Sequence, residues 1–173
     1  MCLGASCNII TSSEDDFYSY SKSWDLWRVP ILQPYEMVSA TNTSAEDWFL
    51  IIEDHHVEGP DFFRSGQRFQ LSSVKTIGIL DSVIVVSNEN HYWPKLSGQY
   101  SSTLIIDLKT KRQYIYSNKH HPAELNETMK ALKVEAIEML EWEMVMHDFL
   151  DNKKLPEIWN KQRLNTDSQQ NQP

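Results

Sequence analysis

Histidine and carboxylate side chains are the residues of this chain whose types are best suited to chemistry. They gather in the segment Glu53-Asp54-His55-His56 and in the pair His120-His121, with His91 between them in the sequence. Neutral imidazoles and carboxylates bind zinc and other first-row metals. However, adjacent residues of an extended chain point to opposite faces, and no His-x-x-x-His spacing occurs. We therefore predict no metal or other cofactor, and keep as an alternative a metal-dependent hydrolase that uses His55, His56, His91 or His121.

Signals for other kinds of catalysis are weaker. A nucleophilic serine needs a base and an oxyanion hole, and the chain has no Gly-x-Ser-x-Gly elbow. The chain contains five glycines and no phosphate-binding loop. Its two cysteines, Cys2 and Cys7, lie close together near the start and match no distant cysteine. The sequence therefore favours a protein without catalytic activity over an enzyme.

Acidic residues dominate the charge of the chain and are unevenly placed. The net charge is −8. Segment 26–66 holds seven acidic residues against two basic ones, and segment 122–150 holds seven acidic residues against two lysines. An acidic surface repels phosphate backbones, so we expect no binding to nucleic acid. We expect a protein partner, and a basic one.

The elements that would position these residues follow from the hydrophobic pattern. Strands are predicted over 35–39, 47–52, 74–79, 83–86, 102–107 and 112–116, with long loops over 53–66 and 87–101. Pro122 is well placed to begin a helix, and the apolar spacing that follows predicts one long helix to about Leu150. The prediction is an α+β fold, with an antiparallel β-meander of five or six strands packed against one long C-terminal helix.

Composition divides the chain into three parts. Residues 1–23 are expected to form a flexible lead-in, 24–160 a single α+β domain, and 161–173 a disordered tail. No apolar run approaches the ~18 residues of a membrane span, so the expected location is the cytoplasm. Small residues before Cys7 resemble the end of a bacterial lipoprotein signal, although a basic region and an apolar region before it are missing. The alternative is thus an envelope lipoprotein tethered through Cys7.

The end of the predicted helix has more apolar residues than one-sided burial needs. Trp142, Met144, Met146 and Phe149 lie around most of its circumference. Either Leu155-Pro156-Glu157-Ile158-Trp159 folds back to cover them, or they contact a partner, which could be a second copy of the chain bound through 142–150. Methionine adapts to interfaces and tryptophan anchors them.

We therefore predict a non-catalytic, acidic interaction protein. Its expected one-sheet, one-helix shape and its charge resemble those of immunity-type inhibitors of basic bacterial toxins, a likeness of architecture and charge alone. The predicted partner-binding residues are Glu46, Asp47, Glu53, Asp54, Asp61, Trp142, Met146 and Phe149.

Overall fold

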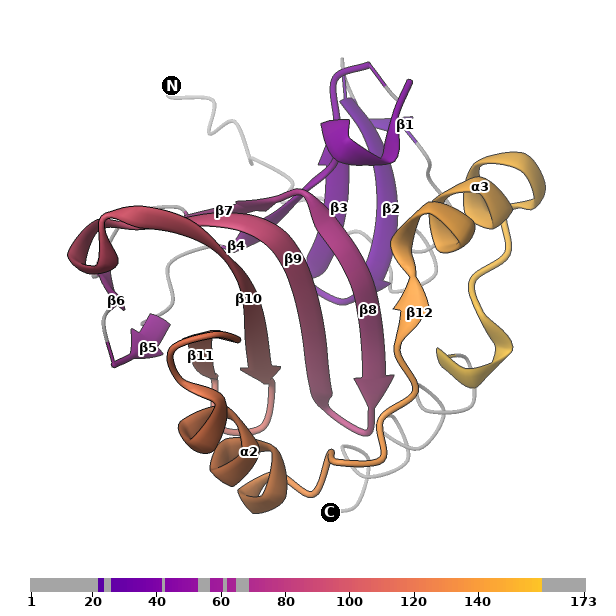
Figure 1. The fold of residues 1–173 in the computed structure, drawn as a ribbon. Helices are drawn as coiled ribbons and strands as arrows, with labels where there is room; N and C mark the ends of the chain where they lie inside the picture. Colours follow the sequence, from indigo (N-terminus) through magenta and orange to yellow (C-terminus); the bar gives the residue numbers. More distant parts are fainter. Residues whose placement is uncertain are drawn as a thin grey trace, which may run out of the picture.

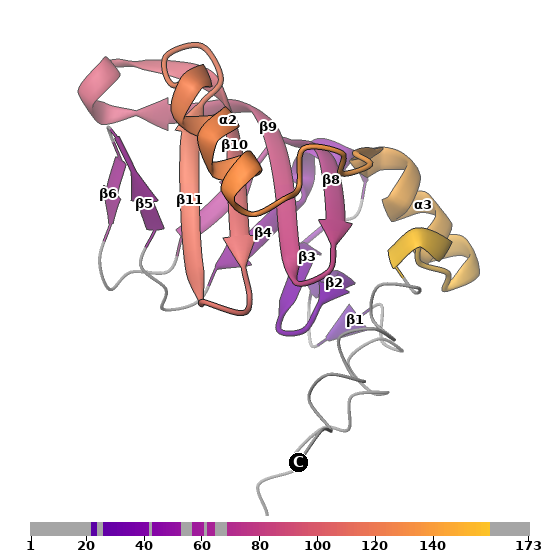
Figure 2. The same ribbon diagram turned by 90° about the horizontal axis from the view of Figure 1, so that it is seen from below.

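Strands form most of the regular structure. The computed structural model describes residues 22–23, 26–41, 43–52, 57–60, 62–64 and 69–159, and all statements below concern this part of the chain. Two sheets lie against each other (Figures 1 and 2). The first is antiparallel and has the order β1 (Lys22–Ser23), β2 (Leu26–Leu32), β3 (Tyr35–Ser39), β4 (Phe49–Ile52) and β7 (Phe69–Ser72).

The second sheet contains the longest strands. Its order is β12 (Leu140–Glu141), β8 (Val74–Leu80), β9 (Val83–Trp93), β10 (Gly98–Asp107), β11 (Arg112–Ser117), β5 (Val57–Gly59) and β6 (Phe62–Arg64). All neighbours are antiparallel except β5, which pairs parallel with β11. The prediction of an α+β fold with antiparallel strands is confirmed. The single meander is wrong, because the strands divide between two sheets and β5 lies beside a strand that comes much later in the sequence.

Two hairpins occur where the sequence predicts them. β8 and β9 are joined at Asp81 and Ser82, where Asp81 has a positive φ of 52°. β10 and β11 pair from Asp107↔Arg112 to Ser102↔Ser117. Alternation along β11 places Ile115 and Tyr116 in the cores on opposite faces of the sheet.

The predicted loop 87–101 is wrong. β9 continues to Trp93, the short 3-10 helix η2 (Pro94–Leu96) turns the chain, and β10 begins at Gly98, which lies opposite Trp93. The segment is polar because this half of the hairpin is partly exposed. Its strand conformation is stabilised by cross-strand pairing, which leaves no simple trace in local hydrophobicity.

The single long helix is also wrong. α2 (Pro122–Ala131) begins at the predicted proline but ends after ten residues, and α3 (Trp142–Asn152) is a separate helix. Lys133 adopts a left-handed conformation with φ 59°. The amide N–H of Val134 donates to the carbonyl of Met129 at 2.9 Å and that of Lys133 to the carbonyl of Lys130 at 3.0 Å. These two bonds are those of a Schellman cap, a position at which glycine is the usual signal.

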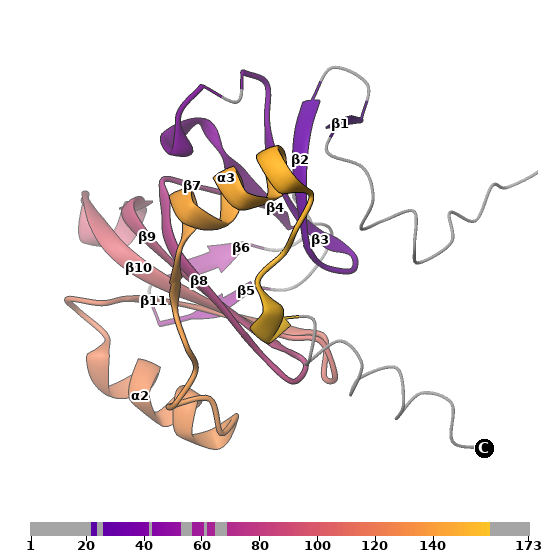
Figure 3. The ribbon, with the colours of Figure 1, turned by 90° about the vertical axis from the view of Figure 1, so that its right-hand side faces the viewer.

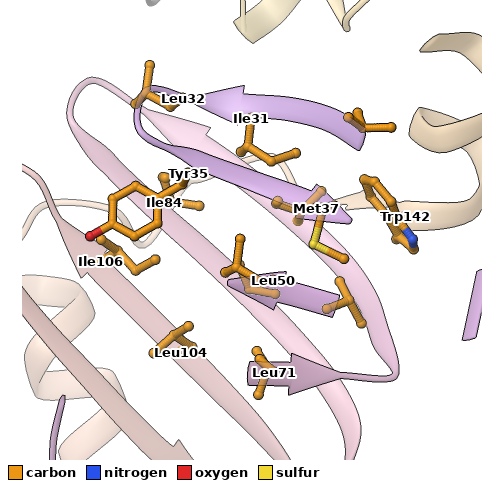
Figure 4. Close-up of a cluster of buried hydrophobic side chains, with 14 of the residues drawn as sticks. Ile31, Leu32, Tyr35, Met37, Leu50, Leu71, Ile84, Leu104, Ile106 and Trp142 are labelled. Atoms are coloured by element: carbon orange, nitrogen blue, oxygen red, sulfur yellow. The ribbon is translucent and has the colours of Figure 1, made fainter. Parts of the chain in front are cut away.

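The main core lies between the two sheets. In Figure 4, Met37, Leu50 and Leu71 of the first sheet lie opposite Ile84 and Leu104 of the second, and all five are buried. α3 lies beside the edge formed by β2 and β8 (Figure 3) and contributes further side chains to the same core. Those side chains are Trp142, Val145, Met146 and Phe149.

A smaller core lies on the outer face of the second sheet under α2. Val83, Val85 and Ile105 are buried there against half-buried side chains of α2, such as Met129. The hydroxyl groups of Tyr116 and Thr128 lie 2.7 Å apart and share a hydrogen bond between β11 and α2. No helix in the described residues is long and apolar enough to cross a membrane. Nearly all of the predicted lead-in, including Cys7, and the whole predicted tail lie outside the described residues.

Candidate functional site

A groove with acidic walls lies between α3, the 3-10 helix η1 (Ala45–Asp47), the start of β8 and the adjoining part of β9. We call it the acidic groove. Its volume is about 380 Å³. The lining residues come from four separate segments of the chain: Thr43, Ser44, Ala45, Glu46, Ser73, Val74, Lys75, Glu89, Asn90, Glu141, Glu143, Met146 and His147.

The charge of the acidic groove is strongly unbalanced. Four exposed glutamates, Glu46, Glu89, Glu141 and Glu143, stand against one lysine, Lys75. The Lys75 ammonium lies 3.8 Å from the Glu89 carboxylate, and both side chains are exposed. Such a pair contributes little to stability in water. The other carboxylates therefore give the groove a negative potential that suits a cationic ligand.

The wall around Glu46 is held by a network of short hydrogen bonds. The Thr41 and Thr43 hydroxyls each donate to the Asp47 carboxylate, both at 2.8 Å. Ser44 caps η1, because its hydroxyl oxygen accepts from the Glu46 amide N–H at 3.2 Å. The bonds from Thr43 and then Thr41 hold the pKa of Asp47 below its ordinary value. The carboxylate of Asp47 thus organises the turn, while that of Glu46 faces the groove.

Two tryptophans behind the groove connect its opposite walls. Trp48, which follows η1, and Trp142, at the start of α3, are fully buried. Their ring centroids are 5.6 Å apart in an edge-to-face arrangement. Such aromatic pairs stabilise by about 0.5–1.5 kcal/mol beyond their burial. The contact fixes α3 relative to η1, so it also fixes the spacing between Glu46 and Glu143.

Among the described residues, the predicted partner-binding positions divide between the acidic groove and the main core. Glu46 and Met146 line the acidic groove together, and Asp47 adjoins it. Trp142, Met146 and Phe149 are all buried in the main core with Leu155 and Trp159, and Met146 also reaches the lining of the acidic groove. The covering of the helix end by 155–159 is the alternative that the structure favours. Glu53, Asp54 and Asp61 lie outside the described residues.

Sequence reasoning missed the contribution of β8 and β9 to the site. Lys75 lies at the start of β8, and Glu89 and Asn90 lie in the second half of β9. The sequence places Lys75 in a predicted strand, and Glu89 and Asn90 in a predicted loop. Only the packing of α3 and η1 beside them makes them part of a groove, and no local signal reports that packing.

A second groove lies on another face of α3, between this helix and residues 156–158, where the chain becomes helical again. We call it the Met144 groove. Its volume is about 410 Å³, and it is lined by Glu138, Leu140, Met144, Val145, Asp148, Pro156, Glu157 and Ile158. Met144 is 54% exposed and belongs to the apolar set that the sequence singles out. Met144 is thus at the surface, whereas Trp142, Met146 and Phe149, the other members of that set, are buried.

Two of the described histidines, His91 and His121, pack against Trp93, and His120 lies beside His121 in the sequence. The rings of His91 and His121 each lie 5.5 Å from Trp93, measured between centroids, and His120 lies 4.6 Å from Tyr100. The indole N–H of Trp93 donates to the Ser102 hydroxyl at 2.9 Å. No group of three metal-binding side chains occurs within the described ranges. His55 and His56 are outside them.

Comparisons with known proteins add no assignment. No protein-family model, no curated protein and no solved structure matches this chain. The geometry and charge of the two grooves are therefore the basis for inferring a function.

Proposed function

We propose that this protein is a non-catalytic binding protein whose acidic groove holds a basic segment of a protein partner. The observation that carries the proposal is the convergence of four glutamates from distant parts of the chain on one concave surface. Lysine and arginine side chains of a partner would meet carboxylates on more than one wall. Complementary charge of this kind speeds association and selects partners.

The build of the walls supports a binding role. η1 is capped by Ser44 and held by Asp47, and the Trp48–Trp142 contact ties it to α3. A groove that is already formed loses little conformational entropy when a ligand enters. The exposed carboxylates need no rearrangement to receive a cation.

An NMR titration with a tetralysine peptide tests the proposal. We expect chemical-shift changes to cluster at Glu46, Glu143 and His147. We also expect the affinity to fall several-fold between about 50 mM and about 200 mM salt, because salt screens exposed charges. Shifts spread evenly over all acidic residues, or none at the groove, would overturn the proposal.

Matched charge variants separate the groove from general acidity. The groove variant carries Glu46→Gln, Glu141→Gln and Glu143→Gln. The control variant carries Glu124→Gln, Glu127→Gln and Glu135→Gln, which change the net charge equally at exposed positions that line neither the acidic groove nor the second groove beside α3. The groove variant should lose binding to tetralysine, and the control should keep it. Equal loss in both variants would mean that net charge alone attracts the peptide.

Inhibition of a basic toxin is one specific form of this proposal. The two-sheet architecture differs from the one-sheet, one-helix shape on which that likeness was based, so acidic charge is what still supports it. Capture from the host with the intact chain and both variants checks it. We expect a basic protein that the intact chain and the control retain and that the groove variant loses. The same captured proteins with all three would count against a groove-directed partner.

A further inference from the structure

The Met144 groove combines an apolar interior with a charged border. Leu140, Pro156 and Ile158 are half-buried, and Met144 is one of three large apolar side chains that are exposed among the described residues. An exposed methionine is a flexible, polarizable contact that adapts to the shape of a ligand. A volume of about 410 Å³ falls within the usual range of pockets that bind small groups, roughly 300–1,000 Å³.

The border of the groove carries one sign of charge. Glu138, Asp148 and Glu157 are exposed, and the described lining includes no lysine, arginine or histidine. These three carboxylates come from the segment before β12, from α3 and from the helical residues 157–159 after α3. They therefore surround the apolar side chains from more than one side. An apolar ligand with flanking positive charge is the chemistry that fits this surface.

The frame of the groove is anchored in the core. β12 pairs with β8 through Leu140↔Ile77 and Glu141↔Thr76. On the far side, Leu155 and Trp159, which flank Glu157 in the sequence, are buried in the main core. The walls are therefore fixed before any ligand arrives, and binding costs little ordering.

We propose that the Met144 groove receives an aliphatic side chain of a protein partner, from a segment in which lysine or arginine flanks that side chain. The inference deepens the proposed function and rests on it: one partner would place basic residues in the acidic groove and an apolar anchor on another face of α3. A second copy of this chain is a poorer occupant, because each copy has a net charge of −8 and like charges repel.

Short synthetic peptides provide the test, with binding to the full chain followed by NMR. The mixed probe is Lys-Lys-Leu-Leu-Lys-Lys, and its partial counterparts are Lys-Lys-Gly-Ser-Lys-Lys and Gly-Ser-Leu-Leu-Ser-Gly. We expect the mixed peptide to shift the signals of Met144, Leu140 and Ile158. Each partial peptide should bind the Met144 groove at least about fivefold more weakly than the mixed peptide does. The first lacks the apolar anchor, and the second lacks the positive charge.

Variants assign the two parts of the interaction. Met144→Gln should weaken binding of the mixed peptide to the Met144 groove by about fivefold, whereas Leu26→Gln, at another exposed apolar position, should not. Asp148→Asn with Glu157→Gln should weaken it by about threefold to tenfold. Glu46→Gln with Glu143→Gln serves as the matched control, since it changes the acidic groove and leaves the Met144 groove intact.

Each contrary outcome overturns a stated part of the inference. Equal shifts from the basic peptide without leucine would show that the apolar interior takes no part. Equal shifts from the uncharged peptide would show that the carboxylates take none. Self-association of the protein that Met144→Gln abolishes would make a second copy the occupant. Tetralysine binding at the acidic groove, together with no response of Met144 to the mixed peptide, would overturn this inference and leave the proposed function standing.

Discussion

At the scale of single residues, a buried hydrogen bond joins the two sheets. The side-chain amide of Gln113 in β11 donates to the Tyr35 hydroxyl oxygen in β3 at 2.9 Å. Both side chains are buried, and the Gln113 carbonyl oxygen has no hydrogen-bond partner among the described residues. A buried donor that loses its acceptor costs about 1–3 kcal/mol. Removing the Tyr35 hydroxyl would therefore leave the whole Gln113 amide unsatisfied.

Tyr35→Phe should lower the free energy of unfolding by about 1–3 kcal/mol at neutral pH. Urea unfolding measures the change. Tyr92→Phe is the control, because Tyr92 is 58% exposed. Removing its hydroxyl should change the free energy of unfolding by less than about 0.5 kcal/mol. Equal effects of the two substitutions would argue against the bond between the sheets.

The burial of Tyr35 also predicts that the stability of the protein falls at alkaline pH. Burial, partly offset by the bond from Gln113, raises the pKa of the Tyr35 phenol above its ordinary value, and burial also raises that of Tyr116. A tyrosine whose pKa is higher in the folded than in the unfolded protein stabilises the fold at every pH below its unfolded pKa. This stability is lost as the pH rises through the pKa of the folded protein. Unfolding curves above about pH 10 should show falling stability, with a shallower fall for Tyr35→Phe. An unchanged slope in the variant would contradict this expectation.

The hydrogen bonds to Asp47 predict that the stability contributed by its carboxylate is lost at acid pH. Its folded pKa is lowered by the hydroxyls of Thr43 and Thr41, so its contribution is present above its unfolded pKa and is lost as the pH falls through the folded one. We expect Thr43→Val to raise the pKa of the Asp47 carboxyl, measured from its carbon-13 shift during acid titration. Thr110→Val is the control, because Thr110 donates to Asp107 instead. A pKa of Asp47 that does not respond to Thr43→Val would refute the network.

At the scale of elements, Gly78 lets the segment before β12 lie against β8. A Cβ at this position would stand 2.7 Å from the Glu138 carbonyl oxygen and 2.9 Å from the Met139 sulfur. Side chains essentially never approach backbone that closely, so the segment 137–139 would have to move. The absence of a side chain at residue 78 is therefore a condition for the path that connects α2 to α3.

Gly78→Ala should destabilise the protein by about 1–3 kcal/mol through overpacking, and it should raise hydrogen exchange in β12. Gly98→Ala is the matched control. There the new Cβ would meet the Tyr100 side chain at 2.9 Å, and a side chain can move aside more easily than backbone. The expectation fails if the substitution at Gly78 is the milder of the two.

α3 has a buried face and an exposed face that a single pair of substitutions distinguishes. Trp142 is fully buried, while Met144 is 54% exposed. Trp142→Ala should reduce the unfolding free energy by about 3–5 kcal/mol, and Met144→Ala by less than about 0.5 kcal/mol. Thermal unfolding ranks the two. A large loss for Met144→Ala would place that side chain in the core and remove the apolar contact of the Met144 groove.

At the scale of the whole molecule, the two sheets and α3 share the main core. Leu50 of β4, Leu104 of β10 and Phe149 of α3 belong to the same buried cluster. Layers that bury one another's apolar faces unfold together. The methyl signals of Leu50 and Leu104 should therefore disappear at the same urea concentration in NMR spectra. Separate midpoints would mean that the sheets are independent units.

Local pattern in the sequence was enough to predict some elements. The hairpin turn at Asp81 and Ser82, the hairpin of β10 and β11, and the start of α2 at Pro122 all depend on residues within a few positions of one another. Alternation along strands and the fixed φ of proline are local properties. The acidic character of segments 26–66 and 122–150 is likewise a matter of composition.

Tertiary structure alone determined the break between α2 and α3 and the two grooves beside α3, because these features depend on contacts between residues that are distant in the sequence. Glu135 to Leu140 are good helix formers, yet the chain is not helical there, since Lys133 closes a cap without glycine and β12 pairs with β8. The two grooves beside α3 exist because this break lets the helix lie across the edge of both sheets. Sequence pointed to an acidic, apolar-rich helix end, and packing determined that Met144 is exposed while Trp142, Met146 and Phe149 are buried.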